Sequence, residues 1–122
     1  MALRVLIVDD EPEIVDLLGE ILASSGFEVA SALDARGALE QIKAQIFDAA
    51  IIDFNLPDMN GVMLHRQIRQ MDEELAKRTL FTSGQMQSDQ DLDYYMVYGG
   101  GFLSKPFEVE EVLSALDKAI NG

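Results

Sequence analysis

Short apolar runs alternate along the chain with segments in which apolar residues recur every three or four positions. The runs cover residues 3–8, 27–30, 47–53, 79–82 and 102–104. Runs of this length, rich in branched and aromatic residues, predict β-strands. The run 47–53 is nearly continuous, which is typical of a strand buried on both faces. It ends in Asp53, whose carboxylate is costly at such a position unless another group pairs with it.

The segments between the runs carry apolar faces at helical spacing and predict a helix after each strand. The first helix is expected to begin at Pro12, and Asp34 is expected to cap the second. The third helix follows the turn-forming loop 56–61, and residues 72–78 are expected to be a polar exit from it. Strand and helix alternate five times, which predicts an α/β fold with a doubly wound parallel sheet and helices on both faces. No repeat, low-complexity tract or linker interrupts the pattern, so residues 1–122 are expected to form one domain.

Polar residues stand at the carboxyl ends of four predicted strands. They are Asp9-Asp10, Asp53, Ser83 and Lys105. In open parallel sheets, binding sites form at these ends, where the strand order reverses. If the first and third strands are neighbours, three carboxylates converge, and either a raised pKa or a bound hard cation must relieve their repulsion. An oxygen-only ligand set suits Mg²⁺.

Lys105 and Ser83 change the expected chemistry of this site. A carboxylate neutralised by a metal and flanked by an ammonium group and a hydroxyl group resembles a site for a tetrahedral anion. Phosphoryl transfer needs an in-line nucleophile, charge neutralisation and positioning. Asp53 is therefore a candidate nucleophile that would form an acyl phosphate.

Composition excludes several other functions. The net charge is −13, from 22 acidic and 9 basic residues, which disfavours direct binding of nucleic acid. The chain has no cysteine, so it has no disulfide framework, thiolate zinc site or thiol nucleophile. No apolar stretch is long enough to span a membrane and residues 1–4 do not begin a signal peptide, so the cytoplasm is the expected compartment.

Taken together, these motifs resemble the response regulator receiver domains of two-component signalling, the CheY-like family. The matching features are the acidic pair in 8–12, the aspartate, proline and glycine in 51–61, the hydroxyl in 81–84 and the lysine-proline pair in 102–107. The resemblance covers essentially the full chain. It implies a flavodoxin-like (βα)5 fold with a five-stranded parallel sheet in the order 2-1-3-4-5.

The resemblance also implies a role for each carboxylate. Asp53 would accept a phosphoryl group from a histidine kinase or a histidine phosphotransfer protein. Asp10 and Asp53 would ligate Mg²⁺ directly, with the backbone carbonyl of Asn55 as a third protein ligand, and Asp9 would act through a bound water.

Further implied roles concern the switch and the loops. Lys105 would pair with the phosphoryl oxygens, and Ser83 would donate a hydrogen bond to them. Phe102 stands where the family keeps a switching aromatic residue, although a plain core residue is an equally good interpretation. The Lys105–Pro106 bond is expected to be cis. Pro57 and Gly61 match structural positions of the loop after the phosphoacceptor.

The choice of Ser83 over Thr82 rests on two arguments. Successive side chains of a strand point in opposite directions, so only one hydroxyl faces the site. The family pattern has a small residue directly after the hydroxyl, and Gly84 follows Ser83. Thr82 is therefore expected to be a packing residue.

The chain departs from the family pattern before the fifth strand, where the usual Gly-Ala is replaced by three glycines at 99–101. Glycine loosens the chain, and the preceding helix in 85–98 is polar and weakly patterned. This helix is expected to be short or mobile, which matters because it borders the usual output surface of the family. Its tyrosines would form either a partner-binding patch or packing contacts: Tyr94, Tyr95 and Tyr98. His65 is expected to be solvated and, without a second histidine or cysteine, a poor metal ligand.

The sequence therefore predicts a phosphorylation-switched receiver that is not a conventional turnover enzyme. It would be a stand-alone regulator or part of a longer protein, and a monomer or a weak phosphorylation-dependent dimer, with a downstream protein as its partner. A haloacid-dehalogenase-like phosphatase is the less favoured alternative, because Asn55 occupies the place of the second aspartate of that class. A nucleotide-binding domain would need a glycine-rich loop where residues 9–12 stand. A degenerate receiver that acts as an interaction module would not need the full set of site residues.

Overall fold

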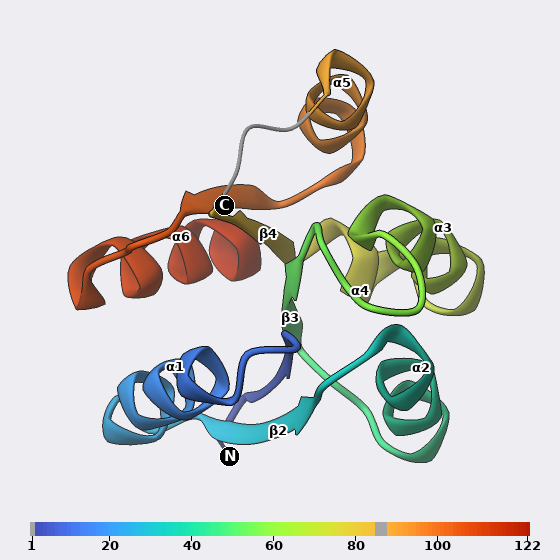
Figure 1. Ribbon diagram of the computed structural model, residues 1–122. Coiled ribbons are helices and arrows are strands. Elements are labelled where there is room, and N and C mark those ends of the chain that lie inside the picture. The colour runs from blue at the N-terminus through green and yellow to red at the C-terminus, as the bar shows by residue number, and fades with distance from the viewer. Residues whose placement is uncertain (1, 85–87) are drawn as a thin grey trace.

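Residues 2–84 and 88–122 are described by the computed structural model, and within them a five-stranded parallel sheet has helices on both faces (Figure 1). The strand order β2-β1-β3-β4-β5 confirms the predicted topology. The strands are β1 (Arg4–Val8), β2 (Glu28–Ala32), β3 (Ala49–Asp53), β4 (Thr79–Ser83) and β5 (Gly101–Ser104). All neighbouring strands are parallel, so their carboxyl ends meet at one edge of the sheet.

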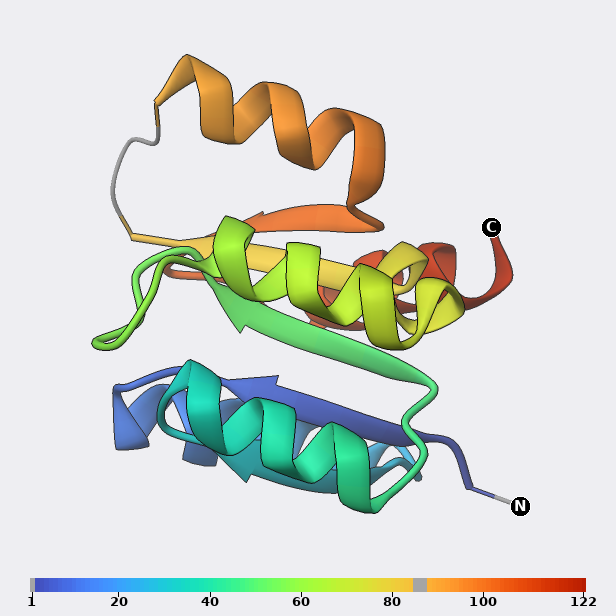
Figure 2. The same ribbon diagram turned by 90° about the vertical axis from the view of Figure 1, so that its right-hand side faces the viewer.

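The helices divide between the two faces of the sheet and its β5 edge. They are α1 (Pro12–Ser24), α2 (Ala35–Ala44), α3 (Gly61–Met71), α4 (Glu73–Lys77), α5 (Asp89–Tyr98) and α6 (Val109–Asn121). In Figure 1, α1 and α6 cover one face, and α2, α3 and α4 cover the other. Figure 2 shows α5 beyond β5, at the edge of the sheet. Within the described residues, no helix is both long and apolar enough to cross a lipid bilayer.

Side-chain alternation along the central strands fills a core on each face. Ile7 and Ile51 pack with α1 and α6, whereas Leu6 and Ile52 pack with α2, α3 and α4. All five residues of β3 are buried, which confirms the prediction of a strand covered on both faces. The burial of β3 carries its last residue, Asp53, to the edge of the apolar core.

The sequence predicted a polar segment without a helix after α3, but the structure has the short helix α4 there. Asp72 ends α3 and also caps α4, because its carboxylate accepts a hydrogen bond of 3.1 Å from the Leu75 amide. Leu75 and Ala76 are buried under this turn. Five residues are too few for an apolar periodicity, so the pattern alone could not show the helix.

The helix before β5 was expected to be short or mobile, and the structure bears only on its length. α5 has ten residues, as many as α2. Residues 85–87 of the predicted segment lie outside the described part of the chain, and the predicted mobility of α5 stays a prediction.

The glycines at 99–101, the last of which begins β5, have a packing reason that is clearest at Gly100. A Cβ atom on Gly100 would lie 2.6 Å from the Lys77 carbonyl oxygen. The Gly100 amide also donates a hydrogen bond of 2.8 Å to the Thr79 carbonyl. Glycine is needed here for close approach to the start of β4, and not only for freedom of the chain.

His65 and Tyr94 are both buried in the folded protein. The prediction of a solvated His65 is wrong, because its side chain is fully buried between α3, α4 and α5. Tyr94 is buried against it, which favours the packing interpretation of this tyrosine. The neighbouring arginines suggested a solvated position for His65. In the structure, His65 lies on the buried face of α3 with Leu64 and Ile68, while Arg66 is exposed.

Candidate functional site

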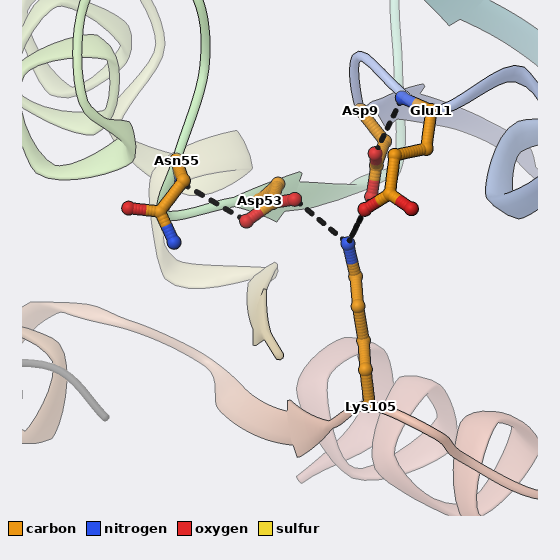
Figure 3. A network of polar contacts seen from close by, with 5 residues as sticks. All are labelled: Asp9, Glu11, Asp53, Asn55 and Lys105. Atoms are coloured by element: carbon orange, nitrogen blue, oxygen red, sulfur yellow. Dashed lines mark hydrogen bonds and ion pairs between the residues drawn. The ribbon is translucent and has the colours of Figure 1, made fainter. Parts of the chain in front are cut away.

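The carboxyl ends of β1 and β3 bring two buried carboxylates together. β1 pairs with β3 up to Val8 and Ile52, so the next residues, Asp9 directly after β1 and Asp53 at the end of β3, lie side by side (Figure 3). Asp9 is 1% exposed and Asp53 is 4% exposed. Two buried carboxylates on neighbouring strands repel each other, so a cationic group is required nearby.

Lys105 supplies that cationic group from the segment after β5. Its Nζ lies 2.8 Å from Oδ2 of Asp53 and 2.8 Å from Oδ2 of Asp9. A third ion pair of 3.2 Å joins it to Glu11. The Lys105 amide donates a hydrogen bond of 2.8 Å to the Ser83 carbonyl, which holds the lysine backbone against the end of β4.

The prediction from the sequence did not assign a role to Glu11. Its carboxylate points at Lys105 in Figure 3, and its amide donates a hydrogen bond of 2.9 Å to Oδ1 of Asp9. The available signal was its place directly after the acidic pair. Glu11 thus belongs to the polar network around Asp53.

The pKa shifts follow from burial and from these contacts. Burial raises the pKa of Asp9, the ion pair with Lys105 and the Glu11 amide oppose the rise, and the charge of Asp53 adds to it. Burial alone would lower the pKa of Lys105, but its hydrogen bonds and charge attraction to Asp53 and Asp9 raise the pKa above its ordinary value. Lys105 therefore stays protonated at neutral pH and leaves the acidic cluster incompletely neutralised.

The remaining negative charge suits a divalent cation. Asp9, Asp10, Glu11 and Asp53 each offer a carboxylate oxygen, and these oxygens lie within 4.8 Å of one another. Asp10 is exposed at the rim, where a partly hydrated ion has access. Hard oxygen donors and open access to water fit Mg²⁺, which keeps several of its waters in proteins.

An open cavity of about 390 Å³ lies above Asp53. Its lining residues are Asp10, Glu11, Asp53, Asn55, Gly84 and Lys105. The structure thus brings together Asp10, Asp53, Asn55 and Lys105 at one cavity. The Asn55 amide donates a hydrogen bond of 2.9 Å to Oδ1 of Asp53, and the Lys105 ammonium group donates one to Oδ2.

The loop between β3 and α3 is folded tightly over the Asp53 backbone. A Cβ atom on Gly61 would lie 2.6 Å from the Asp53 carbonyl oxygen, so glycine is required at this position. The Gly61 amide donates a hydrogen bond of 2.8 Å to the Phe54 carbonyl. Asn60 caps α3 by accepting a hydrogen bond of 2.8 Å from the Met63 amide, and Pro57 is exposed on the loop.

Ser83 ends β4, next to the strand that carries Asp53, and Phe102 lies in β5. Phe81 pairs with Phe102 in the sheet, and Ser83 is two residues beyond Phe81, so alternation points Ser83 and Phe102 to the same face. Thr82 pairs with Asp53 across β3 and β4 and points to the opposite face from Ser83. Both hydroxyl residues are buried, and the choice of Ser83 stays a prediction.

Phe102 contacts an aromatic cluster that begins beside Asp53. Its ring centroid lies 6.0 Å from that of Phe54 and 5.6 Å from that of Tyr95 in α5. Phe54 also stacks on Phe81 with centroids 4.7 Å apart. The ring of Phe102 thus lies between the residue after Asp53 and α5. The Lys105–Pro106 bond is cis, as the resemblance implied.

Comparison with known sequences points to one family. The model of the response regulator receiver domain matches residues 5–117. The chain is 33% identical over 122 residues to the chemotaxis protein CheY of Bacillus subtilis, covering 99% of this chain and 100% of that protein. It is 32% identical over 111 residues to the transcriptional regulatory protein PrrA of Mycobacterium tuberculosis, covering 91% of this chain. It spans 47% of the length of PrrA, about half of that regulator.

Solved structures agree in fold. A CheY-like response regulator receiver domain protein from Methanospirillum hungatei superposes with a TM-score of 0.92 at 25% identity, covering 99% of this chain and 95% of that one. The response regulator protein TrrA from Thermotoga maritima has a TM-score of 0.84 at 26% identity, covering 96% of this chain and 98% of that one. That structure was determined in complex with Mg(2+)-BeF.

Proposed function

The chain belongs to the response regulator receiver domain family, and on that premise we propose that Asp53 accepts a phosphoryl group from a histidine kinase or a histidine phosphotransfer protein. Receiver domains are signalling modules and not turnover enzymes. The observation that carries the proposal is the pairing of Asp53 with Lys105 at a cavity lined by further carboxylates. Residues 1–122 act in this proposal as one receiver domain.

The transfer step uses a carboxylate oxygen of Asp53 as the nucleophile. A new O–P bond forms at this oxygen, and the N–P bond of the phosphohistidine breaks. The bonding electron pair returns to the imidazole nitrogen of the donor. Lys105 already lies 2.8 Å from Oδ2 of Asp53, so it is within reach of an oxygen of the incoming phosphoryl group.

The acidic residues around Asp53 hold the cation in this proposal. Asp10, Asp53 and the Asn55 carbonyl would hold Mg²⁺, and Asp9 would act through a bound water. When bound, Mg²⁺ neutralises charge on the phosphoryl oxygens. The four carboxylates within 4.8 Å of one another support this assignment. Asp9, which lies 2.8 Å from Lys105, also keeps the ammonium group oriented toward Asp53.

Phosphorylation then changes a surface that a downstream protein reads. The phosphoryl group adds negative charge at the end of β3. Ser83 donates a hydrogen bond to this group, and Phe102 moves in response. Because Phe102 contacts both Phe54 and Tyr95, its movement shifts the equilibrium of the face formed by α5, β5 and α6. The protein acts as a monomer or as a weak dimer that depends on phosphorylation.

The test is phosphorylation with a small donor, followed by mass spectrometry. Phosphoramidate suits the test because, like phosphohistidine, it carries an N–P bond. With Mg²⁺, the wild-type chain is expected to gain one acid-labile phosphoryl group at Asp53. Removal of Mg²⁺ with a chelator and the Asp53→Asn substitution should each abolish the gain.

Asp48→Asn is the matched control for this experiment. Asp48 is an acidic residue at the opposite end of β3, where its carboxylate accepts a hydrogen bond of 2.8 Å from the Arg4 amide. This variant should be phosphorylated like the wild type. A wild-type chain that gains no phosphoryl group would leave the interaction module as the better interpretation. Rapid repeated turnover of the donor would instead favour the phosphatase.

A further inference from the structure

A long-range hydrogen-bonded link joins the loop after β3 to the beginning of α2. Oδ1 of Asp58 accepts a hydrogen bond of 2.9 Å from the Ala35 amide, and Oδ2 accepts one of 2.9 Å from the Arg36 amide. Asp58 lies 23 residues from Ala35 in sequence, so this link ties together two segments that meet only in the folded protein.

α2 already has a cap of its own. Asp34 accepts a hydrogen bond of 2.7 Å from the Gly37 amide. The free amides of the first helical turn are therefore shared between two carboxylates, Asp34 for Gly37 and Asp58 for the two amides before it. Asp34 and Asp58 both stabilise the helix N-terminus, but Asp58 alone of the two comes from the loop that contains Asn55.

That loop is closed at its base and held at its tip. At the base, Asn55 and Asn60 form an isolated antiparallel bridge, and Gly61 packs against the Asp53 carbonyl. Asp58 lies at the exposed tip, between these two asparagines. Its link to α2 therefore restrains the loop segment that runs back to Asn55.

We propose that Asp58 is a positioning residue for the metal site: its link to α2 holds the Asn55 carbonyl in place for Mg²⁺ before the ion arrives. The inference rests on the proposed function, which makes that carbonyl a metal ligand. Ordering a loop in advance removes an ordering cost from the binding step, so affinity rises without a new contact to the ion.

The charge state of Asp58 supports a permanent link. Hydrogen bonding from the Ala35 amide lowers the pKa of the Asp58 carboxyl, the Arg36 amide adds to this effect, and slight desolvation of the carboxyl opposes it. The carboxylate therefore stays ionised at neutral pH and at mildly acid pH. The positive end of the α2 dipole favours the same charge.

The experiment compares Asp58→Ala with Asp34→Ala in the full chain. Each substitution removes one cap of α2, but only Asp58→Ala releases the loop. Mg²⁺ is titrated without any phosphodonor, and binding is followed by the amide chemical shifts of Asn55 and Gly61. Asp58→Ala is expected to weaken Mg²⁺ binding about tenfold, the scale found for residues that orient metal ligands. Asp34→Ala should bind Mg²⁺ like the wild type.

Two further readouts separate positioning from general destabilisation. Amide exchange without Mg²⁺ should accelerate across residues 55–60 in Asp58→Ala and not in Asp34→Ala. With phosphoramidate, Asp58→Ala should need about tenfold more Mg²⁺ for half-maximal phosphorylation, yet reach the wild-type rate at saturating Mg²⁺. Asp58→Asn, which keeps one acceptor oxygen, should fall between the wild type and the alanine variant.

The outcomes discriminate clearly. Equal loss of Mg²⁺ affinity in Asp58→Ala and Asp34→Ala would overturn the inference, since both would then act through helix stability. Unchanged affinity in Asp58→Ala and Asp58→Asn would overturn it as well, while the proposed function would stand. A wild-type chain that binds no Mg²⁺ would overturn the inference and the proposed function together.

Discussion

The Tyr94 hydroxyl lies 2.8 Å from Nδ1 of His65, and this buried hydrogen bond joins α5 to α3. Nε2 of the same ring lies 2.8 Å from the Ala76 carbonyl of α4. A carbonyl oxygen accepts hydrogen bonds, so Nε2 carries the proton and Nδ1 of the neutral ring accepts from the tyrosine. One histidine therefore ties three helices together.

Tyr94→Phe is expected to lower the free energy of unfolding. The substitution keeps the ring but leaves Nδ1 of His65 buried without a donor, at a cost of about 1–3 kcal/mol. Tyr98→Phe is the matched control, because Tyr98 is 39% exposed and its ring would still lie under Arg69. The control should change stability by less than about 0.5 kcal/mol. Urea unfolding of both variants checks this, and equal losses would contradict the assignment.

The stability of the protein should depend on the protonation of His65. Burial lowers the pKa of His65, the charge of Arg69 lowers it further, and the hydrogen bond to Ala76 opposes both. Below the ordinary pKa of 6.5, His65 is protonated in the unfolded chain but stays neutral in the folded protein until the pH reaches its lowered pKa. The stabilising contribution is thus complete above pH 6.5 and is lost as the pH falls toward the lower pKa of the folded state.

Unfolding free energies measured from pH 7.5 to pH 5 test this dependence. The wild type should lose up to about 1.4 kcal/mol per pH unit from this one group. His65→Phe lacks the titrating group and should show a correspondingly flatter profile. Parallel profiles for the two proteins would show that His65 does not set the dependence.

Asp9→Asn is expected to stabilise the protein in the absence of Mg²⁺. Because burial raises the pKa of Asp9, its ionised form opposes folding at neutral pH, and a neutral amide removes that cost. The gain in unfolding free energy should be on the order of 1 kcal/mol. Asp10→Asn, at an exposed position, should have a smaller effect. Chemical denaturation measures both, and destabilisation by Asp9→Asn would contradict the prediction.

Ser83→Ala and Thr82→Ala should separate the two hydroxyl groups at the end of β4. Ser83→Ala is expected to leave phosphorylation at Asp53 possible but to abolish the changes that follow it in α5 and β5. Thr82→Ala should keep those changes. NMR spectra with and without a phosphodonor provide the measurement. The reverse pattern would move the switching role to Thr82.

Amide exchange should be faster in α5 than in α1. α5 buries Tyr94, whereas α1 buries Leu18, Ile21 and Leu22 against the sheet. A helix with less buried surface opens at a lower free energy. Hydrogen exchange of the unphosphorylated protein tests the difference, and equal protection of the two helices would show that α5 is not mobile.

Local sequence signals were sufficient for most of the fold. The continuous apolar run before Asp53 predicted a buried strand, and Asp34 was expected to cap α2, as its bond to the Gly37 amide shows. Both signals operate within a few residues of the chain. The five-residue α4 was not predicted, because it is shorter than the stretch of sequence over which a helical spacing of apolar residues can be recognised.

The candidate site was predicted less completely. Asp10, Asp53 and Lys105 stood out as polar residues at the ends of apolar strands, where polarity needs a reason. Glu11 did not stand out, because a charged residue in an exposed acidic turn is solvated and needs no buried partner to explain it. Its ion pair with Lys105 joins residues 94 positions apart.

The sequence by itself determined the alternation of strands and helices and the presence of polar groups at the strand ends, since both follow from spacing along the chain. Tertiary structure alone decided that His65 is buried, that Asp58 holds the start of α2, and that Lys105 bridges Asp9 and Asp53. Each of these contacts needs a partner from another element. The energy of a buried charge or imidazole depends on that partner, which no local pattern contains.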